Sequence, residues 1–169
     1  AFFAKEDYFV IGTICRLAPE KRVEDIIEAV NLLRNKNYKL KTIIVGDGPE
    51  KMRLQSLIQK LNLADNVFFA GEQKNIDSWM RLFDVFVLIS DYEGMSNALL
   101  EAMSVGLPVI GTDMLENREI IKDGENGLLT PVRNPEILAK KIISIIENQD
   151  LKNKLSENAK RFVSENFSL

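Results

Sequence analysis

The sequence contains no histidine, which removes the side chain that enzymes use most often as a general base. Neither a Ser–His nor a Cys–His nucleophile pair can therefore form within this chain. The single cysteine, Cys15, excludes an internal disulfide framework and a cysteine-rich zinc site. If the working protein needs a histidine base, another segment has to supply it.

Long apolar runs and a strong excess of either charge are also missing. The apolar runs are all shorter than the roughly 20 residues that span a bilayer, and we recognise no signal peptide in the sequence. The 22 Lys and Arg residues are balanced by 25 Asp and Glu residues, which argues against a protein that binds nucleic acid through bulk charge. These features and the single cysteine favour a cytoplasmic protein.

Familiar phosphate-binding patterns are absent or incomplete. No GxxxxGK[ST] loop occurs, which disfavours an ATPase or kinase of that class, and no Asp-x-Asp pair suggests a dedicated metal site. The segment GDGPEK, 46–51, lacks the third glycine of a dinucleotide-binding fingerprint and follows the second predicted strand, not the first. We interpret it as a turn that places Pro49 at the first helical position, and DGENGLL, 123–129, as a glycine turn.

The chain does contain a regular alternation of strand and helix patterns. Short, continuously apolar runs predict strands at 9–15, 42–45, 67–70, 85–89, 109–112 and 128–131. Apolar residues at helical spacing predict helices at 23–33, 49–61, 76–83, 97–104, 135–147 and 151–166. Continuously apolar strands are typical of a parallel sheet that is covered on both faces. We therefore predict an α/β fold: a doubly wound, mostly parallel Rossmann-like sheet with helices on both faces, in a single domain over residues 1–169.

Two polar segments follow strands that should be neighbours in such a sheet. Ligands bind beyond the carboxyl ends of the strands where the winding reverses, which in a Rossmann-type order is between the first and fourth strands. The segment CRLAPEKR, 15–22, follows the first strand, and EGMSNALLE, 93–101, follows the fourth. We therefore expect these two segments to converge on one crevice.

The first of these segments carries two positive side chains. Arg16 stands at the end of the strand, and Lys21 comes five residues later, before a helix. A guanidinium and an ammonium that converge there could neutralise a pyrophosphate. The alternative reading is a solvated basic loop.

The second segment combines two carboxylates with the start of a helix. Gly94 permits a tight backbone path, Ser96 or Asn97 can cap the helix, and the free N–H groups of its first turn form an anion site. Glu93 and Glu101 could accept hydrogen bonds from sugar hydroxyls. In the alternative reading, Glu93 is a loop charge and Glu101 is a solvated residue on the helix.

Five stretches that occur in order resemble one family: IGTICRLAPEKR, IIVGDGPE, VFFAGE, EGMSNALLEAMSVGLPVIGTD and DGENGLLTP. Together they resemble the C-terminal, nucleotide-sugar-binding half of retaining GT-B glycosyltransferases of the group 1 (family 4) type. The resemblance runs from about Tyr8 to the end of the chain. It implies that residues 1–169 are the donor-binding half of a GT-B fold and a fragment of a larger enzyme, whose upstream, acceptor-binding domain is missing here.

The resemblance implies the transfer of a sugar, in a hexosyl-type reaction with retained configuration, from a UDP- or GDP-sugar donor to an acceptor. It implies neither a cofactor nor an essential metal. Arg16 and Lys21 would hold the diphosphate. Glu93, the first acid of the E-x7-E motif, would contact the donor sugar and help to stabilise the positively charged transition state. The backbone of four residues would contact the sugar and phosphates: Gly94, Met95, Ser96 and Asn97. Glu101 would bind the ribose. The base would lie near Gly71, Glu72 and Gln73.

From the resemblance we also expect a cytoplasmic enzyme of polysaccharide biosynthesis. Peripheral association of the full-length protein with the inner face of the membrane remains an alternative. We expect the fragment to be inactive by itself. Two alternatives remain: a non-catalytic module that binds a nucleotide sugar or a partner, and a nucleotide-sugar epimerase with a GT-B-like fold.

The sequence departs from the family pattern at three places. Cys15 and Arg22 stand where the family usually has glycine, and residues 114–117, MLEN, replace two glycines that usually help to line the donor site. We expect the loop at Cys15 to run slightly differently from the family's usual path, and the donor contacts near residues 114–117 to differ from the usual ones.

Overall fold

The computed structural model describes residues 7–167, whose strands form one six-stranded sheet. The strands are β1 (Phe9–Ile14), β2 (Leu40–Val45), β3 (Val67–Gly71), β4 (Val85–Leu88), β5 (Val109–Thr112) and β6 (Leu128–Thr130). All neighbours in the sheet pair in parallel, in the order β3-β2-β1-β4-β5-β6. This order confirms the predicted Rossmann-like sheet and places β1 beside β4, where the winding reverses.

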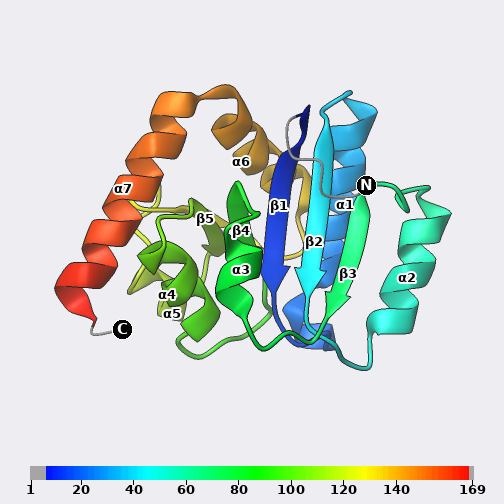
Figure 1. The fold of residues 1–169 in the computed structure, drawn as a ribbon, viewed down its shortest axis with the longest axis horizontal. Coiled ribbons are helices and arrows are strands. Elements are labelled where there is room, and N and C mark those ends of the chain that lie inside the picture. Colours follow the sequence, from blue (N-terminus) through cyan, green and yellow to red (C-terminus); the bar gives the residue numbers. More distant parts are fainter. Residues whose placement is uncertain (1–6, 168–169) are drawn as a thin grey trace.

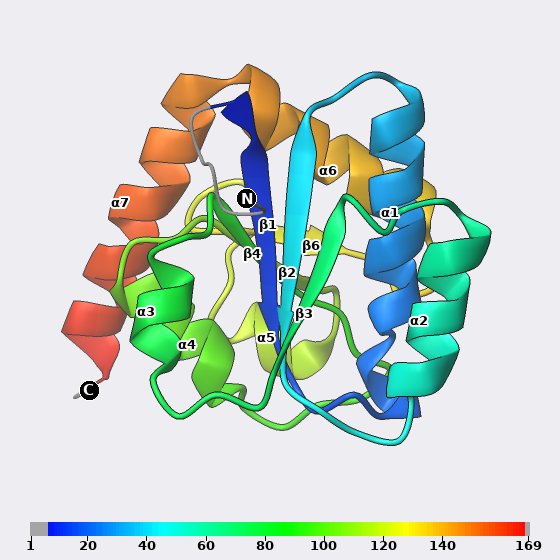
Figure 2. The same ribbon diagram turned by 45° about the vertical axis from the view of Figure 1, so that its right-hand side comes forward.

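Helices cover both faces of the sheet (Figures 1 and 2). One layer consists of α1 (Val23–Asn35), α2 (Lys51–Lys60) and α6 (Pro135–Glu147), and the other of α3 (Ile76–Met80), α4 (Asn97–Ser104) and α7 (Gln149–Asn166). A short helix, α5 (Leu115–Arg118), follows β5, and a 3-10 turn, Pro19–Lys21, precedes α1. No helix within residues 7–167 combines the length and the apolar character that a membrane crossing requires.

The core lies in two apolar layers, one on each side of the sheet. Every residue of β4 is buried: Val85 and Val87 face the layer that contains α1 and α6, while Phe86 and Leu88 face the layer that contains α4 and α7. Because successive side chains of a strand point to opposite faces, a strand covered on both sides has to be apolar throughout. This is the physical reason for the unbroken apolar runs in the sequence.

Some predicted boundaries were wrong by a few residues. Helix α2 starts at Lys51, and Pro49 lies in the preceding turn, because the N–H of Glu50 donates to the carbonyl oxygen of Leu17 outside the helix (2.9 Å). Helix α7 starts two residues earlier than predicted. The side chain of Asn148 accepts a hydrogen bond from the N–H of Leu151 (3.0 Å) and caps this helix directly after α6 ends.

Candidate functional site

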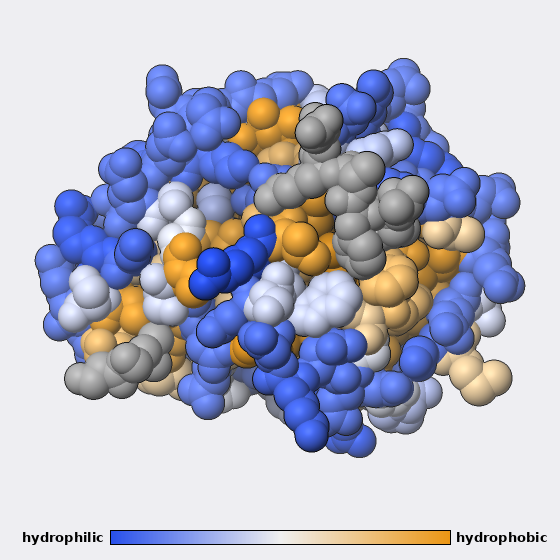
Figure 3. Space-filling view, in the orientation of Figure 1, coloured by the Kyte–Doolittle hydropathy of each residue, from blue (hydrophilic) through white to orange (hydrophobic). Residues whose placement is uncertain are grey.

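A pocket of about 460 Å³ opens at the carboxyl ends of β1, β2 and β3. Its lining residues are Ile14, Cys15, Arg16, Val45, Gly46, Asp47, Glu72, Gln73 and Ile76. Three of the predicted site residues, Arg16, Glu72 and Gln73, therefore share this pocket. Hydrophilic residues dominate the lower margin of the molecule in Figure 3, where the loops after these strands lie.

The loop after β1 runs against the loop after β2, which sets the direction of Arg16. The N–H of Leu17 donates to the carbonyl oxygen of Asp47 (2.9 Å), so the two loops continue the pairing of their strands. Gly46 has a φ of +132°, and a side chain there would clash with the backbone of Cys15. Leu17 is consequently buried, while the side chain of Arg16 is exposed at the pocket. The guanidinium of Arg16 has no hydrogen-bond or ion-pair partner within residues 7–167.

Cys15, which replaces the family's usual glycine, forms part of the pocket wall. Burial raises the pKa of its thiol to about 11, so the side chain is a neutral thiol near pH 7. The charges of Lys21 and Glu93 act on this pKa in opposite directions. Both charges therefore lie close enough to the pocket wall to influence it.

Lys21 and Glu93, from the two predicted polar segments, are in direct contact. The ammonium of Lys21 donates to Oε1 of Glu93 at 2.7 Å, and the two side chains are only 18% and 14% exposed. The hydroxyl of Ser90 donates to the other carboxylate oxygen, also at 2.7 Å. Ser90 is itself buried and fixed by its N–H, which donates to Oγ1 of Thr112 (2.8 Å). We did not predict Ser90 from the sequence, although a small polar residue at the end of an apolar run could have pointed to it.

A second set of contacts, which we call the loop brace, joins the same segments. It consists of Arg22, Asp25, Asp91 and Arg133. Buried Asp25 accepts hydrogen bonds from Nη2 of Arg22 (2.7 Å) and from the backbone N–H of Arg133 (2.8 Å). The guanidinium of Arg133 pairs with Asp91 (2.9 Å), whose own N–H donates to the carbonyl oxygen of Glu20 (2.8 Å). The brace thus fixes the start of the DYEG loop against the 3-10 turn that carries Lys21.

Arg22 stands after Lys21, where the family that the sequence resembles commonly has glycine, and its backbone adopts a conformation that suits glycine. Its φ is +41°, in the left-handed region that favours glycine. Its guanidinium pairs with Glu24 (2.8 Å) and Asp25 (2.7 Å). These two ion pairs hold Arg22 in a backbone conformation that a glycine would adopt without strain.

The segment after Glu93 leads into the amino end of α4. The Oγ of Ser96 accepts a hydrogen bond from the N–H of Leu99 (3.2 Å), so Ser96 is the cap and Asn97 is the first helical residue. Asn97 and Met95 are exposed. A side chain at Gly94 would meet nothing within 4 Å, so the protein's own packing does not require glycine there. The space beside Gly94 is open to a ligand.

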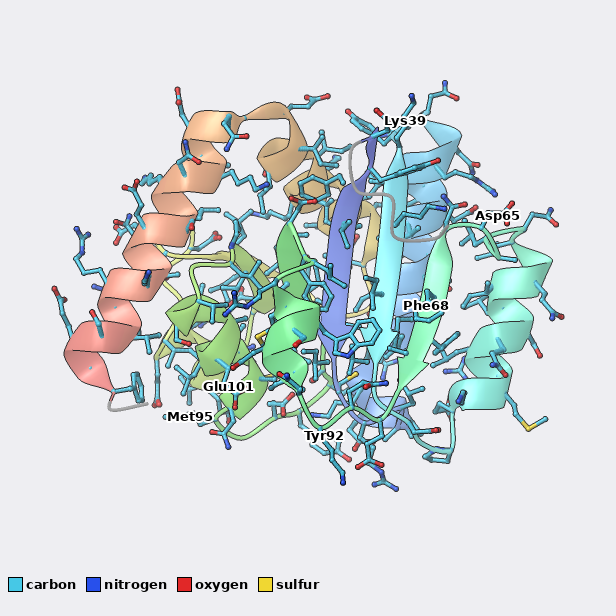
Figure 4. All side chains as sticks on the ribbon, in the orientation of Figure 1. Lys39, Asp65, Phe68, Tyr92, Met95 and Glu101 are labelled. Atoms are coloured by element: carbon cyan, nitrogen blue, oxygen red, sulfur yellow. The ribbon has the colours of Figure 1, made fainter. Side chains whose placement is uncertain are left out.

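Glu101 lies one turn further along α4, and its carboxylate has no hydrogen-bond or ion-pair partner in the described part of the chain. In Figure 4, Glu101, Met95 and Tyr92 all lie along the lower margin, and Lys39 lies at the opposite edge of the molecule. Glu101 therefore belongs to the same edge as the loops after the strands.

The loop after β3 reaches the pocket through a bulge. The pairing of β2 with β3 shifts by one residue, so Val45 pairs with Gly71 and Ala70 is left over. Gly71 has a φ of +72°, and its carbonyl oxygen accepts the N–H of Gly46 (2.8 Å). The side-chain amide of Gln73 donates to the carbonyl oxygen of Ala70 (2.7 Å). The bulge thereby turns the residues after Gly71 toward the pocket.

The third departure from the family, residues 114–117, forms most of the short helix α5, which the sequence did not predict. The buried amide of Asn117 donates to the carbonyl oxygen of Thr112 (2.8 Å) and fixes this helix to the end of β5. Leu115 is largely exposed. Within residues 7–167, no group of three or more His, Cys, Asp or Glu side chains is arranged to hold a metal ion.

The structure brings most of the predicted site residues to one edge but in two groups. Lys21 and Glu93 are in contact, and Glu93 leads directly into the segment from Gly94 to Asn97. Arg16 shares the neighbouring pocket with Glu72 and Gln73. Among the described residues, the side chain of Arg16 makes no hydrogen bond to the segment from Gly94 to Asn97. A bound molecule would have to bridge the two groups.

An all-parallel sheet with its polar loops gathered at the β1–β4 switch point defines an α/β domain of the Rossmann-like kind. Residues 1–162 match the family model "Glycosyl transferases group 1". The chain therefore belongs to the group 1 glycosyl transferases, and its sheet is the Rossmann-like half of a GT-B glycosyltransferase.

One curated relative is N-acetyl-alpha-D-glucosaminyl L-malate synthase of Bacillus anthracis, which is 33% identical over 148 residues, 87% of this chain and 38% of that protein. The crystal structure of Anabaena HepE in complex with UDP-glucose superposes with a TM-score of 0.90 and 28% identity, covering 96% of this chain and 45% of that one. The C-terminal domain of the group 1 protein LpcC from Francisella tularensis has a TM-score of 0.86 and 26% identity, covering 98% and 90%. The chain spans 38% to 46% of the length of three curated relatives that it matches.

Proposed function

We propose that this chain is the donor-binding, C-terminal domain of a retaining glycosyltransferase that transfers a hexosyl group from a nucleoside-diphosphate sugar to an acceptor. The observation that carries the proposal is the contact of Lys21 with Glu93 beside the pocket of Arg16. It brings a cation suited to phosphate and a carboxylate suited to a sugar to the same crevice. Acceptor binding, and any histidine base, belong to an upstream domain, so the fragment by itself transfers nothing.

In this proposal the diphosphate of the donor is held by Arg16, Lys21 and the amino end of α4. Arg16 offers a guanidinium that no described residue engages, and its planar fork suits two phosphate oxygens. Lys21 adds a point charge. The N–H groups of Asn97 and Ala98, in the first turn of α4, have no partner inside the helix and favour an anion, whereas that of Leu99 donates to Ser96. These groups neutralise the leaving diphosphate, and the reaction needs no resident metal or cofactor.

The sugar lies against Glu93 and the backbone of Gly94, Met95, Ser96 and Asn97. A carboxylate held at that place favours the positive charge that develops on the sugar in the transition state. Open space at Gly94 lets the sugar approach the backbone. Beyond the phosphates, Glu101 accepts hydrogen bonds from the ribose hydroxyls.

The base occupies the pocket beside Gly71, Glu72 and Gln73. Apolar Ile14, Val45 and Ile76 form its walls, which suits a flat aromatic ring. UDP is the first nucleotide to test, because the similar structures of Anabaena HepE and of the pneumococcal transferase GtfA contain UDP-glucose or UDP with GlcNAc. The names of several relatives suggest polysaccharide or cell-envelope synthesis, and we place the full-length enzyme in the cytoplasm.

Calorimetric titration of the 169-residue chain with UDP-glucose, GDP-glucose and ADP-glucose tests this proposal. We expect a Kd of about 0.1 mM or weaker for one of them, because half of the cleft is missing, and no sugar transfer to water or to acceptor. The solved C-terminal domain of LpcC indicates that a domain of this size can be studied alone. Absence of binding to all three nucleotide sugars, in a chain shown to be folded, would overturn the proposal.

A further inference from the structure

Lys21 already has an anionic partner within the protein, so any phosphate that binds there has to compete with Glu93. Resting on the proposed function, we propose that Glu93 discriminates between the intact donor and the released nucleoside diphosphate, and that Ser90 is the positioning residue that holds Glu93 across Lys21. Glu93 would thus weaken the binding of the product in addition to its contact with the sugar.

The geometry makes this competition strong. The Lys21–Glu93 contact is short, at 2.7 Å, and more than four fifths of each side chain is shielded from water. Attraction between charges is several times larger in such surroundings than in bulk water. A second hydrogen bond from Ser90 occupies the other oxygen of Glu93. The carboxylate is therefore held in one orientation, with both oxygens engaged.

The two nucleotides differ in charge at the position that Lys21 would contact. In the donor, the outer phosphate is esterified by the sugar and carries one negative charge. In the released diphosphate that phosphate is terminal, and with a second pKa of about 6 it carries nearly one further charge above pH 7. Glu93 repels the additional charge, whereas the sugar of the donor can offer hydroxyl groups to the same carboxylate. One side chain can therefore favour the donor and disfavour the product.

Ser90 acts on this discrimination only through Glu93. Its hydroxyl faces the carboxylate, and its backbone is fixed by Thr112 in the neighbouring strand. Without the hydroxyl, Glu93 keeps its charge but loses one of its two anchors. Replacement of Ser90 should therefore weaken the competition for Lys21 without abolishing it.

The test is calorimetric titration of UDP and of UDP-glucose into the wild-type chain and into Glu93→Gln, Ser90→Ala and the double variant, with thermal unfolding to verify folding. Glu157→Gln, at an exposed position of α7, is the matched control. We expect Glu93→Gln to bind UDP about tenfold more tightly and UDP-glucose no more tightly than the wild type. Ser90→Ala should tighten UDP about threefold, and this gain should vanish in the Glu93→Gln background.

The outcomes separate this inference from the proposed function. If the wild type binds UDP and Glu93→Gln binds it equally or more weakly, the inference is wrong and the proposed function stands. A Ser90→Ala effect that persists unchanged in the Glu93→Gln background would show a general structural role and remove Ser90 as a positioning residue. If the folded wild type binds neither UDP nor UDP-glucose, the same titrations are made with GDP and ADP and their glucose esters, and absence of binding to all three nucleotide sugars means that the proposed function itself fails. Should Glu93→Gln not fold, Ser90→Ala carries the test alone, and a folded Ser90→Ala variant that binds UDP no more tightly than the wild type would then contradict the inference.

Discussion

The charged groups at the carboxyl edge of the sheet are of two kinds. In the loop brace, Asp25 and Asp91 each bind groups from other segments of the chain. At the pocket and along α4, Arg16 and Glu101 have no such partner within residues 7–167. The first kind holds the loops in place, and the second is available to a ligand. From this difference we infer that this edge divides stability and proposed ligand binding between different residues.

Lys21 and Glu93 belong to both kinds. They join two loops in the structure, and they are also the groups that we expect a nucleotide sugar to engage. Substitution of Lys21 or Glu93 should therefore alter both stability and binding. Substitutions in the brace should alter mainly stability, and substitutions of Arg16 or Glu101 should alter mainly binding. The predictions below use this contrast.

Removing Asp25, the buried carboxylate of the brace, should cause the largest loss of stability. Asp25→Ala leaves the guanidinium of Arg22 with one partner fewer and the backbone N–H of Arg133 without its acceptor. We expect the free energy of unfolding in urea to fall by about 3 kcal/mol. The matched control is Asp113→Ala, which breaks an exposed ion pair with Arg118 of the same 2.7 Å length and should cost about 1 kcal/mol or less. Equal losses in the two variants would show that Asp25 contributes no more to stability than an exposed ion pair does.

The stability of the protein should depend on Cys15 above pH 9. Burial raises the pKa of this thiol to about 11 in the folded protein, while the ordinary value is 9.0. Between pH 9 and 11 the thiol loses its proton in the unfolded chain but keeps it in the folded protein. The stability that the protonated thiol contributes is therefore intact below pH 9 and is lost as the pH rises to 11. We expect a loss of roughly 2 kcal/mol. Urea unfolding of wild type and Cys15→Ala at both pH values isolates this contribution, and identical pH profiles would contradict it.

In contrast to the brace, Glu101 should affect ligand binding more than stability, and its substitution should have the smallest effect on stability of those considered. Its carboxylate has no described partner to lose, so Glu101→Ala should change the free energy of unfolding by about 0.5 kcal/mol or less. Loss of its proposed hydrogen bonds to ribose should weaken UDP-glucose binding about fivefold. Titration beside the control Glu157→Ala measures this effect. Unchanged affinity would return Glu101 to the role of a solvated helix residue.

The fold could be predicted from the sequence because a short, continuously apolar run is enough to indicate a buried strand. The apolar run at 85–89 predicts a strand covered on both faces, and β4 (Val85–Leu88) is indeed buried throughout. The order of the sheet then places the loops after β1 and β4 together, so the closeness of Lys21 and Glu93 followed from topology alone.

The sequence did not predict the brace, because its contacts depend on loop conformation. Arg133 and Asp91 are 42 positions apart, and no motif connects them. Arg22 adopts a left-handed conformation that its residue type does not suggest. Helix α5 was also missed, because Asn117 fixes it through a buried side-chain hydrogen bond that local propensity does not reveal.

The measurement that addresses the central claim most directly is titration of UDP-glucose into the Arg16→Ala/Lys21→Ala double variant. Its control is Arg161→Ala/Lys140→Ala, which removes the same side-chain types from exposed positions of α7 and α6. If the two cations hold the diphosphate, the double variant should bind at least about 100-fold more weakly than the wild type, while the control pair binds as the wild type does. A folded double variant that keeps wild-type affinity would contradict the account.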